Sequence, residues 1–339
     1  MKAFKYILFL LLILIIGMAI YVAIQPNEFE VSRTRTINAP SQVVYNQVID
    51  LKNWEAWSSW AESDPDMRIT LSEQTKGIGG SYSWEDKDGA GTMKITETIP
   101  NTSIQQEMQF EDMPASNVSW NFQENKDGAT QVKWTISGKD LTFKFKAFTT
   151  LIGGIEKEIA PHYERSLEKL DSIVLASMQV YSVNINGITQ HGGGYYIYNT
   201  ASCKISDLPS KMEELMPKIT SYTKQNSITM AGAPFTSYHK WDIENNAVMF
   251  SCCIPTTEKV ITSEPDILTG QLKPFKAIKT TLKGNYTNLK EAWETASNYI
   301  KTNNLEEAPD ASALEVYRTE PSRTPNPADW ITEIYIPIK

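Results

Sequence analysis

The chain has 339 residues, of which 41% are hydrophobic and 21% charged, and its formal net charge is −8. This composition is typical of a globular protein of roughly two domains, and it excludes a disordered, collagen-like or coiled-coil chain. Nucleic-acid binding needs Lys and Arg to neutralise phosphates, whereas this chain has 32 Lys and Arg against 40 Asp and Glu. We therefore expect no nucleic-acid partner. Because it has only 3 cysteines, the chain is also unsuited to a disulfide scaffold.

An uncharged, almost wholly apolar segment runs from Tyr6 to Ile24. As a helix it would span about 28 Å, close to the hydrocarbon thickness of a bilayer. A cleaved signal peptide is the alternative, but its apolar region would be shorter and small residues would precede the cleavage site. Tyr21 stands where a small residue belongs before Ala23. We therefore expect residues 1–27 to be an uncleaved transmembrane anchor.

The charges that flank this segment predict its orientation. Lys2 and Lys5 precede it, whereas Glu28 and Glu30 follow it. By the positive-inside rule the N-terminus is cytoplasmic, and the remaining chain lies outside the inner (cytoplasmic) membrane.

Residues 28–177 alternate in the manner of an antiparallel sheet bounded by helices. Phe29–Ile37 predicts a strand, and Gln42–Ile49 predicts a short helix with Ser41 as its N-cap. A long closing helix is indicated by apolar residues at helical spacing from Ile155 to Leu170. Between the helices, alternating runs separated by turn signals predict strands at 68–75, 80–85, 92–99, 103–110, 117–123 and 130–136.

Three phrases of this segment, TINAPSQVVYNQVIDLKNWEAWSSW, GIGGSYSW and HYERSLEKLDSI, resemble the SRPBCC (START-like, polyketide-cyclase-type) helix-grip family. The resemblance implies a sheet that grips one long helix around a cavity of lipid size, without a fixed catalytic set. Tryptophans could line such a cavity, but we expect most of them to be core. They are Trp54, Trp57, Trp60, Trp84, Trp120 and Trp134.

Residues 178–339 contain a tandem repeat of a strand–helix–strand–strand unit. The spacing of apolar helix positions is the same in both copies, Tyr238 aligns with Tyr317, and both closing strands end in Ile-Pro. Two such units predict a pseudo-two-fold arrangement with a ligand groove between the halves. The matching helix positions are Leu208, Met212, Leu215 and Ile219, and Leu289, Trp293, Ala296 and Ile300.

The phrases LKGNYTNLKEAWETASNYI, SALEVYRTEP and WITEIYIPIK resemble the GyrI-like (AraC-type) effector-binding domain, which is also the drug-sensing domain of certain bacterial multidrug regulators. In that family a pocket glutamate among tyrosines receives cationic aromatic ligands. Some members hydrolyse strained cyclopropane-bearing natural products with a Tyr and a Glu. The DNA-binding helix-turn-helix domain of the regulators is replaced here by a membrane span and a helix-grip segment, so transcription control is not implied.

The repeat also suggests where the ligand binds. Glu315 aligns with Thr236 and Glu333 with Ser251, so both carboxylates occur in one half only, inside otherwise apolar strands. A carboxylate there is costly unless it is paired or faces water or a ligand; exposure to solvent is the open alternative. The expected ligand-binding residues are Tyr196, Tyr198, Tyr286, Trp293, Glu315, Tyr317 and Glu333.

No metal-binding or phosphate-loop motif occurs, and His162, His191 and His239 have no metal-ligand spacing. We expect no metal and no cofactor. The sequence favours a membrane-anchored protein that binds small hydrophobic or cationic molecules as a sensor or scavenger without catalysis. The alternative is a hydrolase of strained electrophilic natural products, with Glu315, Glu333 and Tyr286 as its catalytic residues.

Overall fold

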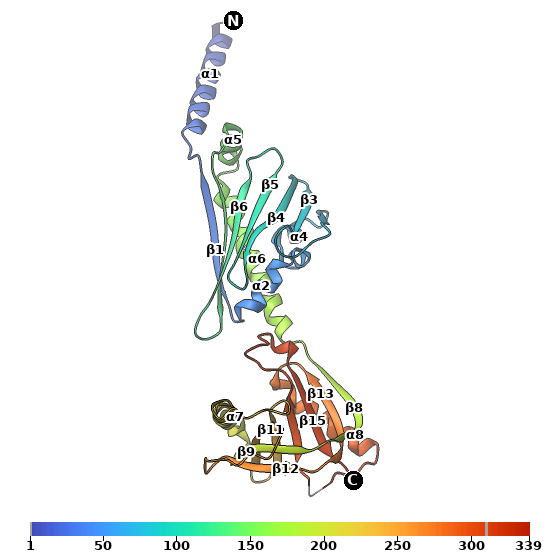
Figure 1. Cartoon of the computed structure of the whole chain (residues 1–339). Helices are drawn as coiled ribbons and strands as arrows, with labels where there is room; N and C mark the ends of the chain where they lie inside the picture. Colours follow the sequence, from blue (N-terminus) through green and yellow to red (C-terminus); the bar gives the residue numbers. More distant parts are fainter. Residues whose placement is uncertain (1, 309–310) are drawn as a thin grey trace. The chain divides into compact units, whose positions relative to one another are not determined.

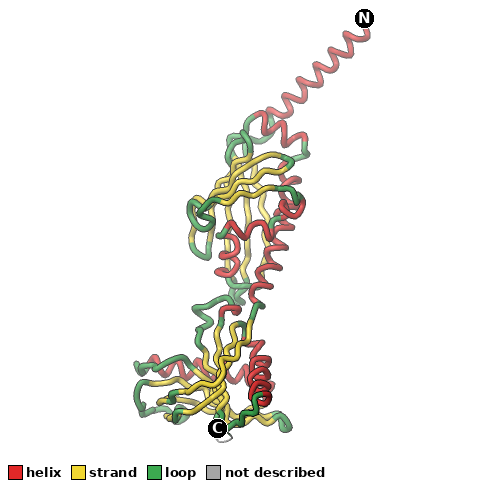
Figure 2. Tube along the Cα trace, turned by 90° about the vertical axis from the view of Figure 1, so that its right-hand side faces the viewer, coloured by secondary structure: helices red, strands yellow, loops and turns green. Residues whose placement is uncertain are grey.

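The structure is a computed structural model that describes residues 2–308 and 311–339. Its residues divide into two units, 1–176 and 177–339, and each contains one antiparallel sheet with accompanying helices (Figure 2). The α+β class expected from the sequence is confirmed.

The apolar N-terminal segment forms a single helix, α1 (Lys2–Ala23). By length and composition, Phe4–Ala23 is apolar enough to cross a membrane, and most of its large side chains are exposed. A helix that is apolar on all sides has no polar face to turn toward water.

The sheet of the first unit has seven strands in the order β1-β7-β6-β5-β4-β3-β2. All neighbours are antiparallel, and alternate residues of the strands are buried as the sequence pattern predicts. The strands are β1 (Phe29–Ile37), β2 (Arg68–Leu71), β3 (Ser81–Asp86), β4 (Gly89–Ile99), β5 (Ser103–Phe110), β6 (Ser116–Glu124) and β7 (Thr130–Gly138).

Helix α6 (Ile155–Met178) is the long closing helix of this unit (Figure 1). Its buried stripe includes Leu167 and Leu170, and the ring of Tyr163 stacks on Trp134 with centroids 3.6 Å apart. Arg33 of β1 adds ion pairs to two glutamates of α6. The space between helix and sheet is therefore occupied by aromatic rings at this point.

The tryptophans of this unit divide between two environments. Trp57, Trp120 and Trp134 are buried core residues. Trp54, Trp60 and Trp84 are only half-buried, so the core takes half of the predicted set rather than most of it.

Short helices connect β1 to β2: α2 (Ser41–Ile49), α3 (Trp54–Trp57) and α4 (Ser59–Ser63). The predicted N-cap role of Ser41 is wrong, because Pro40 holds the cap position and Ser41 is the first helical residue. The backbone N–H of Ser41 instead donates to the carboxylate of Glu124 at 2.7 Å. A further helix, α5 (Phe143–Leu151), lies between β7 and α6 and was not predicted from the sequence.

The sheet of the second unit has eight strands in the order β12-β9-β11-β10-β14-β15-β13-β8. Its helices are α7 (Leu208–Gln225) and α8 (Leu289–Thr302). The strands are β8 (Ser182–His191), β9 (Gly194–Lys204), β10 (Phe235–Asp242), β11 (Ala247–Thr256), β12 (Leu268–Leu272), β13 (Phe275–Lys283), β14 (Ala313–Tyr317) and β15 (Ile331–Pro337).

This strand order confirms the repeat. The first copy is β9-α7-β10-β11 and the second is β13-α8-β14-β15, and they meet where β10 pairs with β14. Because Tyr238 is equivalent to Tyr317, Thr236 is equivalent to Glu315, and these two residues are also opposite each other in the ladder. A pair of positions that is both equivalent and directly paired lies on the local two-fold axis.

Candidate ligand-binding groove

A cavity of about 1850 Å³ lies in the second unit, lined by residues of α7, α8, β10 and β14. Its volume exceeds the ~300–1,000 Å³ of common small-molecule pockets. The helices contribute large apolar side chains, such as Met212 and Met216 from α7 and Trp293 from α8, together with polar and charged ones. The central strands contribute Tyr238, Glu315 and Tyr317.

Glu315 is the buried polar centre of this groove, with 3% of the residue exposed. One carboxylate oxygen accepts from the Trp293 indole N–H at 2.5 Å, and the other accepts from the Tyr317 hydroxyl at 3.0 Å. The Tyr238 hydroxyl also lies close enough to lower the pKa of this carboxyl group. Tyr317 is in turn bonded to Thr236, whose hydroxyl lies 2.9 Å from the phenol oxygen.

Burial raises the pKa of Glu315 above its usual value of 4.5, while the donors of Trp293, Tyr317 and Tyr238 counteract part of that rise. These donors are all neutral. Burial likewise raises the pKa of Tyr238 and Tyr317 well above 10, so both phenols stay protonated and remain donors at neutral pH. The carboxylate therefore has hydrogen-bond partners but no described cation that shifts its pKa.

Aromatic rings surround the carboxylate within the groove. The Tyr286 ring lies 5.7 Å from that of Tyr317, and the Tyr238 ring contacts Trp293 edge-on at 5.7 Å. Burial raises the pKa of Tyr286 to about 12. Ring faces with a carboxylate among them suit a flat or globular organic cation.

Glu333 does not belong to this groove. Its strand neighbours Ile334 and Ile336 pack against α8, so the alternation of β15 turns Glu333 to the opposite face of the sheet. There Lys279 and Arg318 form ion pairs with it at 2.7 Å and 2.6 Å. Although burial opposes this, the pKa of Glu333 is lowered by these two cations and by the Tyr335 hydroxyl.

Tyr196 and Tyr198 also lie away from Glu315. Ile197 between them packs against α7, whereas the two tyrosines pack with Phe235 in the cluster on the other face. Gly270 makes room for the Tyr196 ring, since a Cβ at that glycine would lie 2.4 Å from it.

The structure thus divides the predicted set of seven residues between two faces of one sheet. Tyr286, Trp293, Glu315 and Tyr317 line the groove together, whereas Tyr196, Tyr198 and Glu333 do not. Tyr238, which also lines the groove, was not among the predicted site residues. Its equivalence with Tyr317 across the repeat was the signal that would have identified it.

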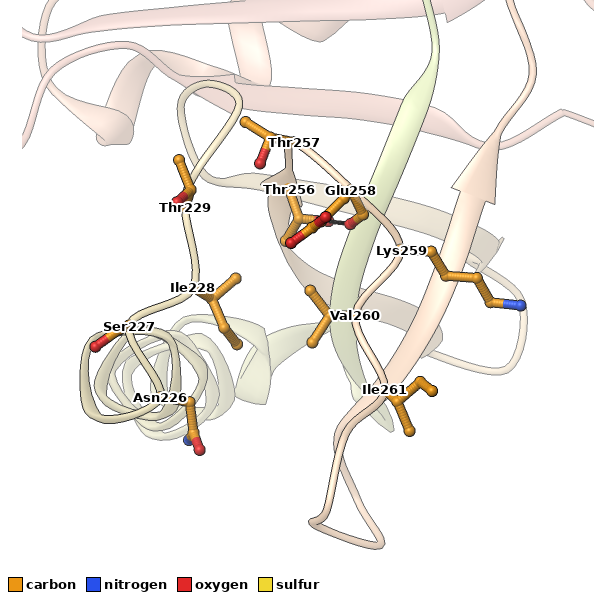
Figure 3. Close-up of a pocket in the computed structure, with 10 residues that line it drawn as sticks. All are labelled: Asn226, Ser227, Ile228, Thr229, Thr256, Thr257, Glu258, Lys259, Val260 and Ile261. Atoms are coloured by element: carbon orange, nitrogen blue, oxygen red, sulfur yellow. Dashed lines mark hydrogen bonds between the residues drawn. The ribbon is translucent and has the colours of Figure 1, made fainter.

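A second hollow of about 390 Å³ lies at the end of α7, between 226–229 and 256–261 (Figure 3). Ile228 and Val260 point toward each other across it, and the Lys259 side chain points away. The Thr256 hydroxyl donates to the Glu258 backbone carbonyl at 2.7 Å. This hollow is formed by two loop segments, and it has no buried charge comparable to Glu315.

Comparisons with known proteins assign both halves of the chain. Residues 28–174 match the family described as polyketide cyclase / dehydrase and lipid transport, and residues 195–339 match the GyrI-like small molecule binding domain. No curated protein matches the chain.

Among solved structures, the EcmrR C-terminal domain is 18% identical, covers 48% of this chain and 99% of its own, and has a TM-score of 0.41. A chain of the EcmrR–DNA complex is 17% identical, covers 58% of this chain and 71% of its own, and has a TM-score of 0.41. SAV2435 bound to tetraphenylphosphonium is 10% identical, covers 46% of this chain and 94% of its own, and has a TM-score of 0.37. On its two family matches, the chain consists of a polyketide cyclase / dehydrase and lipid transport domain followed by a GyrI-like small molecule binding domain.

Proposed function

We propose that the protein is a membrane-anchored receptor for small hydrophobic cations, acting as a sensor or scavenger, and that the groove over β10 and β14 is its binding site. The family match of residues 195–339 to a small molecule binding domain supports a ligand of this size class. The buried carboxylate of Glu315 supports a positive charge on that ligand.

The contrast between the two glutamates carries the proposal. Glu333 is neutralised by Lys279 and Arg318, as a buried carboxylate ordinarily must be. Glu315 is more deeply buried, yet its described partners are uncharged hydroxyl and indole donors. An uncompensated carboxylate in an aromatic cavity is relieved by a bound cation, which regains both charge pairing and ring contacts.

The groove also has charged residues at its rim, and they do not neutralise Glu315. Lys240, Lys290 and Arg323 line it with largely exposed side chains, and the exposed Glu294 pairs with Lys290 on the same helix at 3.9 Å. Exposed charges are screened by water and salt. The rim charges therefore influence the approach of the ligand, whereas the buried Glu315 selects a ligand with a positive charge.

The anchor completes the proposal. We place α1 in the inner membrane with its N-terminus in the cytoplasm and both soluble units outside, because Lys2 and Lys5 precede the span. The net charge of −8 supports the absence of a nucleic-acid partner. In that position the receptor meets hydrophobic cations before they enter the cell.

Native mass spectrometry of the detergent-purified full chain tests this function. We expect a co-purified small molecule, or saturable binding of added tetraphenylphosphonium that displaces it. Absence of both, with the chain folded by circular dichroism, would contradict a receptor role.

Hydrolysis is a second candidate function, favoured by the raised pKa of Glu315, which accepts from the Tyr317 phenol and shares the groove with Tyr286. A carboxylate of raised pKa can act as a general base toward water. Incubation of purified protein with cyclopropane-bearing electrophiles, followed by mass analysis, distinguishes the two functions, because a receptor leaves the compound unchanged.

A further inference from the structure

Helix α5 presents an apolar face to the outside of the first unit. Phe143, Phe148 and Leu151 are 54%, 43% and 74% exposed, respectively, although all three are large and apolar. At 100° per residue they fall within one arc of the helix, together with the exposed Lys144. The opposite side of α5 is buried through Phe145 and Lys146.

The ends of α5 are well defined, so this exposed face is not a frayed segment. The Thr142 hydroxyl caps the first turn by accepting from the Phe145 N–H at 3.2 Å. After Leu151 the chain turns at Gly153 and Gly154, whose φ values of +87° and +106° suit glycine.

Several contacts fix α5 to the segment that follows α1. The Lys146 side chain, only 7% exposed, donates from Nζ to the carbonyls of Gln25 at 2.8 Å and Ala23 at 3.3 Å. Its ammonium thereby satisfies carbonyls at the negative end of the α1 dipole. Phe145 stacks on Phe29 at the start of β1, with centroids 5.7 Å apart.

We propose that the outward face of α5 inserts into the lipid surface at the point where α1 leaves the membrane. The proposal rests on the proposed anchoring by α1. If Phe4–Ala23 spans the bilayer, Ala23 and Gln25 lie at its boundary, and α5 is bound to those two residues. Its exposed phenylalanines and leucine are thus held at the depth where amphipathic helices bury their apolar side, and Lys144 can reach the headgroups.

A lipid occupant explains why the apolar residues of α5 point outward. In water, three large apolar side chains on one short helix would be an unfavourable patch. A bilayer in contact with the helix removes them from water, and the first unit is then held against the membrane rather than tethered freely.

Spin labelling of the full chain in vesicles of phosphatidylcholine and phosphatidylglycerol tests the insertion. Cys203→Ser removes the partly accessible thiol, and Cys252 and Cys253 are buried. In that background one nitroxide is placed by Leu151→Cys and a second by Phe143→Cys, both at exposed sites. Collision rates with oxygen, which concentrates in lipid, and with a water-soluble nickel chelate report the depth of each label.

Lys126→Cys gives the matched control. It lies in the exposed turn between β6 and β7. Since β1 pairs Phe29 with Gly138 and Ile37 with Thr130, that turn lies at the end of the sheet remote from α1. We expect the ratio of oxygen to nickel collisions to be several-fold higher at 143 and 151 than at 126.

The alternative outcomes are distinguishable. If the vesicles carry the chain in flotation but the labels at 143 and 151 behave like that at 126, the insertion is contradicted and the anchor stands. If the chain does not float with vesicles, both are contradicted. If the labels are shielded from both reagents and broadened by spin–spin coupling, a second copy of the chain covers the face and the lipid proposal fails.

Discussion

Thr236 and Glu315 are direct partners across the β10–β14 ladder and also equivalent positions of the two repeats. The local two-fold axis therefore passes between a hydroxyl and a carboxylate, where the symmetry of the domain is chemically broken. The groove has related walls from α7 and α8 but one carboxylate at its centre. We infer that the second unit binds one cation, whose charge points toward Glu315 of the second repeat.

Trp293→Phe tests the support of the carboxylate. The change keeps a ring but removes the N–H that donates to Glu315. Loss of a donor to a buried charge costs about 1–3 kcal/mol of folding stability, and it raises the pKa of Glu315 further. Chemical denaturation at neutral pH measures the first effect. Met212→Leu, at the equivalent position of α7, serves as the control and should change stability much less.

The raised pKa of Glu315 predicts a definite pH dependence. The folded chain holds the proton more tightly than the unfolded chain, whose value is near 4.5. The stability associated with this group is therefore fully present below 4.5 and is lost as pH rises through the folded pKa. Cation affinity moves oppositely and strengthens over that range, because the proton competes with the ligand. Stability and affinity titrations of wild type and Glu315→Gln should differ in this window, and parallel profiles would contradict the assignment.

Lys146→Met tests the attachment of α5 to the end of α1. Without the ammonium, the carbonyls of Ala23 and Gln25 lose their charged donor. A loss of about 1.5–3 kcal/mol corresponds to a roughly 10- to 150-fold larger open population of this junction and to faster hydrogen exchange in the same ratio. Hydrogen exchange of residues 142–152 in the full chain measures it. Lys144→Met changes an exposed charge of the same helix and should leave exchange nearly unchanged.

The proposed topology is tested by protease added to intact spheroplasts. Because the positive flank is N-terminal, the soluble units should be digested while a cytoplasmic marker protein stays protected. Protection of both units until lysis would reverse the orientation.

The sequence was informative where periodicity reports burial. The alternation of Phe29–Ile37 predicted strand β1. The matched spacing predicted that Leu208 and Leu289 begin equivalent helices of the two copies, as they do in α7 and α8. Helix α5 was not predicted, because its large apolar residues Phe143, Phe148 and Leu151 face outward and form no core stripe. Alternation also shows that Tyr196 and Ile197 face opposite ways, but not which of them meets a helix. Which face of a strand meets a helix depends on packing between elements. The same packing places Glu315 in the groove and Glu333 on the opposite face of the sheet.

The central claim is that Glu315 binds the charge of the ligand, and one thermodynamic cycle tests it most directly. Methyltriphenylphosphonium and its neutral near-isostere triphenylphosphine oxide are titrated by calorimetry against wild type and Glu315→Gln. Glu294→Gln at the exposed rim and Glu333→Gln on the opposite face of the sheet serve as controls. We predict that Glu315→Gln weakens binding of the cation by about 2–5 kcal/mol, roughly 30-fold or more, and leaves the neutral compound nearly unaffected. Equal affinity of the cation for wild type and Glu315→Gln would contradict the account.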